Sequence, residues 1–146
     1  MRFKKILVAV DGATAGTDVL PTAAELARCT GAELALITVA DVRGIGVSEV
    51  SPPAHAAAAM LREEAARLLQ GAAAELAADA KPLMIVREGL PEKELAAAAR
   101  DWHADVLVMG THARTGLAHI FHASVAESVL HHSPCPVLLL RIGQPA

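Results

Sequence analysis

The sequence predicts an α/β fold in which a doubly wound sheet of five parallel strands lies between two layers of helices, giving three layers. The first supporting observation is a set of five short apolar runs without polar alternation, which is typical of strands covered on both faces. The second is that segments with helical periodicity separate these runs. A strand-helix alternation over the whole chain favours parallel strands joined by right-handed crossovers.

The composition fits one domain over residues 1–146 with an aliphatic core, because 53% of the residues are hydrophobic and only 2% are aromatic. A formal net charge of −3 and the absence of any Lys/Arg block argue against nucleic acid as a partner. Charges interrupt every apolar stretch before the roughly 18 residues that a membrane span needs. We therefore expect a cytoplasmic protein without a membrane partner. Cys29 and Cys135 are far apart in the sequence, so we expect them to be small buried hydrophobic residues and not a redox pair.

The first strand is predicted at residues 4–10, a continuous apolar run that ends directly before Asp11. A turn of small residues then leads into a helix over residues 17–30. The second strand, residues 33–39, follows the break at Gly31, and residues 41–53 form a long connection that we expect to be a mobile flap.

The rest of the chain continues the alternation. The predicted elements are a helix at 54–79, a strand at 82–86, a helix at 92–102, a strand at 105–109, a helix at 124–131 and a strand at 137–140. The charged residues of the helix at 54–79 are expected to form its solvent-exposed face. Pro91 comes just before the helix at 92–102, where a helix tolerates proline.

The stretch MGTHARTGLAHIFHAS, residues 109–124, leads from the fourth strand through Gly110 and a polar loop into a helix. The first N–H groups of a helix lack backbone partners and the helix dipole places positive charge there, so an anion is favoured at this end. Ser124 can cap the helix or contact a phosphate oxygen, and Arg114 can add a full charge. A capped junction that binds no ligand remains the alternative.

The same stretch resembles the nucleotide loop of the universal stress protein family, whose pattern is Gly, two residues, Gly, nine residues, Gly, and then Ser or Thr. Gly110 and Ser124 match the ends of the pattern, whereas Ala113 and Ala123 stand at its inner glycines. Other matching residues are Thr111, His112, Arg114, Thr115, Gly116, Leu117, Val125, Ala126 and Glu127. The resemblance covers residues 3–141 and implies the strand order 3-2-1-4-5.

The resemblance also implies a ligand, ATP or another adenine nucleotide, with or without Mg²⁺. Asp11, which by itself reads as a turn or capping carboxylate, matches a strand-end Asp that contacts the adenosine. Thr38 and Val39 match the segment behind the adenine. Strands 1 and 4 are neighbours in the implied order, so their carboxyl ends form one crevice. The implied binding residues are Asp11, Val39, Gly110, Thr111, Ala113, Arg114, Ala123, Ser124 and Val125.

The function implied by the resemblance is a homodimeric regulatory module of the stress response. The fifth strand runs from Val137 to Leu140 and lies at an edge of the sheet in the implied order. Because it is apolar, we expect it to pair with the same strand of a second copy. The alternative is a dimeric stress protein that binds no nucleotide appreciably, because alanines replace two glycines, and that acts through protein contacts. No catalytic motif is present, so we expect slow ATP hydrolysis at most. His119 and His122 could share a helix face, but no zinc-type set completes a metal site.

Overall fold

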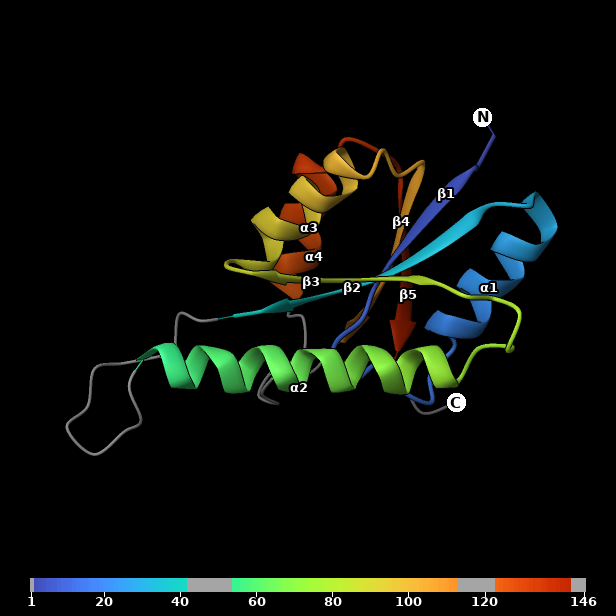
Figure 1. The fold of residues 1–146 in the computed structure, drawn as a ribbon. Coiled ribbons are helices and arrows are strands. Elements are labelled where there is room, and N and C mark those ends of the chain that lie inside the picture. The colour runs from blue at the N-terminus through green and yellow to red at the C-terminus, as the bar shows by residue number, and fades with distance from the viewer. Residues whose placement is uncertain (1, 42–53, 113–122, 143–146) are drawn as a thin grey trace.

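The computed structural model describes residues 2–41, 54–112 and 123–142 as a five-stranded sheet with helices on both sides (Figure 1). The strands are β1 (Lys5–Ala9), β2 (Glu33–Ala40), β3 (Leu83–Glu88), β4 (Val106–His112) and β5 (Val137–Ile142), and the helices are α1 (Val19–Thr30), α2 (Ala54–Ala74), α3 (Pro91–Asp101) and α4 (Ala123–His132). All neighbouring strands are parallel. The order β3-β2-β1-β4-β5 confirms the predicted topology.

Two hydrophobic layers cover the sheet, one on each face. Ile6 and Val8 of β1 pack with residues of α1 and α2, whereas Leu7 and Ala9 pack with residues of α3 and α4. This division follows from the alternation of side chains along a strand. We call the two sides the α1/α2 face and the α3/α4 face; Figure 1 shows α3 and α4 together on one side of the sheet and α2 on the other.

The core is aliphatic, as the composition predicts. The largest fully buried side chains of the described residues are Ile, Leu, Val and one Met, and none is aromatic. Each buried aliphatic side chain contributes roughly 1.5–3 kcal/mol relative to an exposed one. The central strand β1 is buried on both faces, which explains its continuous apolar run.

Several element ends differ from the predicted ones. β4 continues to His112 instead of ending at Met109, because its last three residues pair with β5. α2 ends at Ala74 instead of near residue 79, since Glu75 and Leu76 donate to carbonyls three residues back and tighten the last turn. The predicted connection at 41–53 lies outside the described residues apart from its first residue.

The cysteines also differ from expectation. Cys29 is exposed, because it lies on the solvent side of the last turn of α1, and Cys135 is half-buried before β5. Burial raises the pKa of the Cys135 thiol above its usual value. In the described part of the chain, every helix is too short or too polar to cross a membrane.

Candidate functional site

The candidate site lies at the carboxyl edge of the sheet, where β1, β2 and β4 end beside one another. Asp11 follows β1 by two residues, Val39 lies near the end of β2, and Thr111 is the second-last residue of β4. Helices that follow parallel strands run back along them, so α4 begins at this same edge. The structure therefore brings together residues from distant parts of the sequence, as predicted.

Most of these residues also lie on the same side of the sheet. Met109 packs into the core of the α3/α4 face, and Thr111 follows it by two residues, so both side chains point to that face. Val39 packs against the same core, and Val125 of α4 belongs to it. The α3/α4 face thus holds an apolar side chain, a hydroxyl and a helix N-terminus at one edge.

Asp11 is buried, with 4% of its surface exposed, and holds a turn together. Its Oδ1 accepts hydrogen bonds from the Ala13 N–H at 2.9 Å and from the Thr14 hydroxyl at 3.0 Å. Its own N–H donates to the Thr14 Oγ1 at 2.9 Å. The carboxylate therefore has the turn role that its sequence position suggests, and these bonds also fix its orientation at the edge.

Thr14 is a residue that the sequence reasoning did not include in the site. Its hydroxyl donates to the Asp11 carboxylate and accepts from the Asp11 N–H, which ties the turn closed on both sides. Asp followed by Thr three residues later is a pattern that allows such local bonds, and this spacing could have indicated the pair.

Gly110 lies inside β4, paired with Leu140, instead of ending the strand as predicted. A Cβ at this position would lie 2.8 Å from the Ile142 Cδ1 and 3.0 Å from the Val19 Cγ2. Both neighbours are buried side chains of the α1/α2 face. The side chains of Ile142 and Val19 thus leave little room for a Cβ here, whether or not a ligand approaches Gly110.

α4 begins at Ala123, one residue earlier than predicted. Ser124 is consequently the second residue of the helix, with an exposed side chain, instead of its first. It still lies in the turn whose backbone N–H groups lack helical partners, so its hydroxyl and these groups can face an anion together. Val125 turns inward and anchors this turn to the core.

Part of the predicted site lies outside the described residues. Ala113 and Arg114 belong to this part, as do His119 and His122, and only the backbone of Ala123 is described. Within the described ranges, no group of three His, Cys, Asp or Glu side chains is arranged to hold a metal ion. At the other end of α4, the Nδ1 of His132 lies 2.8 Å from the Ser128 carbonyl oxygen, so this imidazole can satisfy a carbonyl of the last helical turn.

A pocket of about 320 Å³ lies on the other side of the sheet. Its floor includes Val10 and Ala72, which belong to the core of the α1/α2 face. Arg67 and Glu75 also line it, and the Glu75 carboxylate accepts a hydrogen bond from the Gly16 N–H at 2.9 Å. This pocket is therefore separate from the residues gathered on the α3/α4 face.

Comparison with known proteins agrees with this architecture. The universal stress protein MJ0531 of Methanocaldococcus jannaschii is 44% identical over 54 residues, which are 37% of this chain and 32% of that protein. The chain thus matches only about a third of the length of such curated relatives.

Solved structures match over almost the whole chain. The structure of MJ0577, also from M. jannaschii, is 28% identical with a TM-score of 0.79 and covers 99% of this chain and 100% of that one. A universal stress protein in complex with cAMP shares the fold at 22% identity and a TM-score of 0.58, covering 96% of this chain and 98% of that one. The profile of the universal stress protein family matches residues 2–141. Because this match spans nearly the full length, the chain belongs to the universal stress protein family.

Proposed function

We propose that this chain is a cytoplasmic regulatory module that binds an adenine nucleotide, with ATP as the first candidate. One observation carries the proposal: Val39, Thr111 and the first turn of α4 lie on one face of the sheet at its carboxyl edge, with Asp11 at the same edge. Crevices at this edge of doubly wound sheets are where such folds bind ligands. The cAMP complex of a protein with the same fold supports the ligand class.

The residues present suit the parts of such a ligand. Val39 offers an apolar wall for the base, and the oriented carboxylate of Asp11 can accept hydrogen bonds from ribose hydroxyls. Thr111 and the first turn of α4, which carries Ser124, can donate to phosphate oxygens. An accompanying Mg²⁺ would bind the phosphates and keep several waters, as is usual for magnesium at nucleotide sites.

Ala113 and Ala123, which replace the inner motif glycines, argue for weak binding. Glycine adopts positive φ without cost and lets backbone N–H groups approach a phosphate closely. At position 113, an alanine in a left-handed conformation would cost roughly 1–2 kcal/mol, which corresponds to a loss of affinity of about 5- to 30-fold. Ala123 is the first residue of α4, so at this position only the methyl group could hinder a phosphate at the helix N-terminus. We therefore expect the double change Ala113→Gly, Ala123→Gly to tighten ATP binding.

The test has two parts. Freshly purified protein is extracted with acid and the released nucleotide is identified by chromatography. Wild type and the double variant are then titrated with a fluorescent ATP analogue, with unlabelled ATP as competitor. Tighter binding by the double variant supports the proposal. Binding by neither protein at millimolar ligand would overturn it.

The second candidate function is a stress protein that acts only through protein contacts. The observation in its favour is the replacement of both inner motif glycines by Ala113 and Ala123. It differs from the first candidate in one measurable respect, since it requires that the wild type binds no nucleotide, whether or not the double variant does. An enzymatic role beyond slow ATP hydrolysis is not part of either candidate.

We further propose that the module is a homodimer formed through β5. This strand is an edge of the sheet, and its apolar residues Val137, Leu138, Leu139 and Leu140 remain partly exposed. An apolar sheet edge with open backbone groups is favourable for pairing with a second copy of the same strand.

A further inference from the structure

We infer that Arg141, near the end of β5, contacts the phosphate groups of the bound nucleotide. The inference rests on the proposed function and adds to it a residue that lies outside the family's nucleotide loop. Three features of the described residues support it, namely the register of β5 against β4, the position of α4, and the lack of an ion pair at Arg141.

The register places Arg141 directly beside Thr111. These two residues are paired across the parallel strands β4 and β5, whose spacing is about 4.8 Å. The preceding pair on the same side, Met109 and Leu139, packs into the core of the α3/α4 face. Because side chains alternate along both strands, Arg141 and Thr111 point to this face as neighbours.

α4 packs on both β4 and β5 on this same face, and its N-terminal turn lies at the carboxyl edge where Arg141 stands. Arg141 and the positive end of the helix dipole thus lie on the same face at the same edge of the sheet. Two positive groups at one place are unfavourable unless an anion lies between them. A phosphate group would relieve this repulsion and would bind to both.

Arg141 is exposed and makes no ion pair or side-chain hydrogen bond within the described part of the chain. Arg62 and Arg87 differ, because both are paired with carboxylates of neighbouring elements. A free guanidinium has a planar set of donors that matches two phosphate oxygens at once. Arg141 is therefore available for an anion, whereas Arg62 and Arg87 are already engaged.

The experiment compares ATP with adenosine in wild type and Arg141→Gln, a change that removes the charge but keeps a polar side chain. We expect ATP affinity to fall about 10-fold, with a weaker dependence on salt, and adenosine affinity to stay the same. Arg141→Lys should recover part of the loss, since lysine keeps the charge without the planar fork.

Arg100→Gln is the matched control. Arg100 is exposed, also has no ion pair in the described part of the chain, and lies in the last turn of α3, at the opposite edge of the sheet. The Arg100→Gln change removes the same charge as Arg141→Gln, and we expect it to leave ATP affinity at the wild-type value. Thermal unfolding and sedimentation of the apo proteins establish that all variants are folded and have the same oligomeric state.

The possible failures are distinguishable. Wild type that binds neither ATP nor adenosine would overturn the proposed function and the role of Arg141 with it. Wild type that binds ATP no more tightly than Arg141→Gln would overturn the role of Arg141 alone. The same conclusion follows if Arg141→Gln and Arg100→Gln weaken ATP binding equally, since the effect would then come from overall charge.

Discussion

At the residue scale, Gly110 and Gly71 differ in how much room their surroundings leave for a Cβ. Gly110 has two buried side chains within 3.0 Å of the place where a Cβ would stand. Gly71, inside α2, has nothing within 4 Å of the corresponding position. A change to alanine should consequently have opposite effects at the two sites.

We predict that Gly110→Ala lowers the free energy of unfolding by about 1–3 kcal/mol, because the added methyl group would crowd the side chains of Ile142 and Val19. In an Ile142→Val background, which lacks the Cδ1 atom, the cost should be smaller. Gly71→Ala is the control, and it should be neutral or stabilise by up to about 1 kcal/mol through helix propensity. Urea unfolding of the single and double variants measures these values, and strictly additive costs at positions 110 and 142 would contradict the packing explanation.

The candidate site could be predicted only in part from the sequence. The positions of Asp11 and Thr111 at one edge follow from strand ends and topology, and both were predicted. The two hydrogen bonds between Asp11 and Thr14 depend on the exact turn conformation, which residue types alone do not determine. Arg141 was missed because its relevance depends on how far β5 pairs with β4, a tertiary feature without a local signal.

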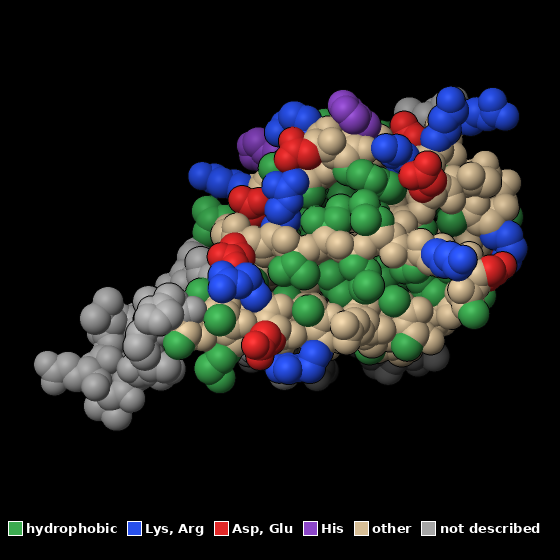
Figure 2. Space-filling view, in the orientation of Figure 1, with side chains coloured by type: hydrophobic (Ala, Val, Ile, Leu, Met, Phe, Trp, Pro, Cys, Tyr) green, Lys and Arg blue, Asp and Glu red, His purple; other side chains and the backbone are tan. Residues whose placement is uncertain are grey.

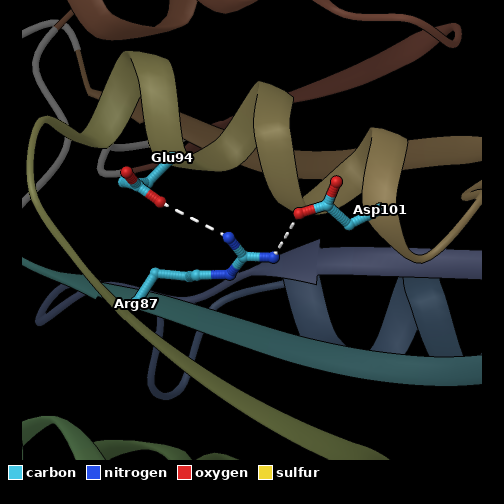
Figure 3. Close-up of polar contacts among 3 residues, drawn as sticks. All are labelled: Arg87, Glu94 and Asp101. Atoms are coloured by element: carbon cyan, nitrogen blue, oxygen red, sulfur yellow. Dashed lines mark hydrogen bonds and ion pairs between the residues drawn. The ribbon is translucent and has the colours of Figure 1, made fainter.

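At the element scale, the edge strand β3 is connected to a helix on each face by ion pairs. Arg87 Nη2 lies 2.8 Å from the Asp101 Oδ2, and its Nη1 lies 3.6 Å from the Glu94 Oε2 (Figure 3). Both carboxylates belong to α3 and are seven residues, about two turns, apart, so they project from the same face of the helix. On the other side, Arg62 of α2 pairs with Glu88 at 2.6 Å.

We predict that these ion pairs contribute little to stability. Arg87→Ala should lower the free energy of unfolding by less than about 1 kcal/mol, because Asp101 is exposed and Arg87 and Glu94 are only half-buried, so water and salt screen these charges. Leu95→Ala, on helix α3, is the comparison. Because Leu95 is fully buried, this change should lower the free energy of unfolding by about 2–5 kcal/mol. Urea unfolding at low and high salt tests both values, and an Arg87→Ala cost equal to that of Leu95→Ala would contradict the prediction.

The kinds and the order of the elements follow from the sequence, but several ends do not. Apolar runs and helical periodicity identify all nine elements of the described chain. The last three residues of β4 were assigned to a loop, because Gly110 and the polar residues after it resemble a strand exit. Pairing with β5 outweighs this local preference.

At the scale of the whole molecule, the sheet has two edges that differ in their surroundings. Figure 2 shows hydrophobic side chains in the middle of the surface that carries β3, with charged side chains around them. Leu83 and Met84 contribute to the exposed apolar surface of this strand, while its end is occupied by the ion pairs of Arg87 and Glu88. Charged residues at the β3 edge hinder pairing with another strand. The β5 edge begins with four apolar residues and has no charge before Arg141, so it is the more favourable edge for pairing.

The hydrogen-bond pattern of β5 makes its proposed role in the dimer testable. The Leu107 N–H donates to the Pro136 carbonyl, and parallel ladders use every second residue of a strand. The N–H of Leu139 therefore points away from β4 to the open edge, and that of Leu138 points toward β4.

We predict that Leu139→Pro converts the dimer into a monomer that remains folded, because proline removes a donor that only a second copy would use. Leu138→Pro is the matched control, and it should destabilise the fold itself by removing a donor directed at β4. Sedimentation at tens of micromolar reports the oligomeric state, and thermal unfolding reports the stability of each variant. A wild-type monomer at this concentration, or a dimer that Leu139→Pro leaves intact, would exclude β5 as the interface.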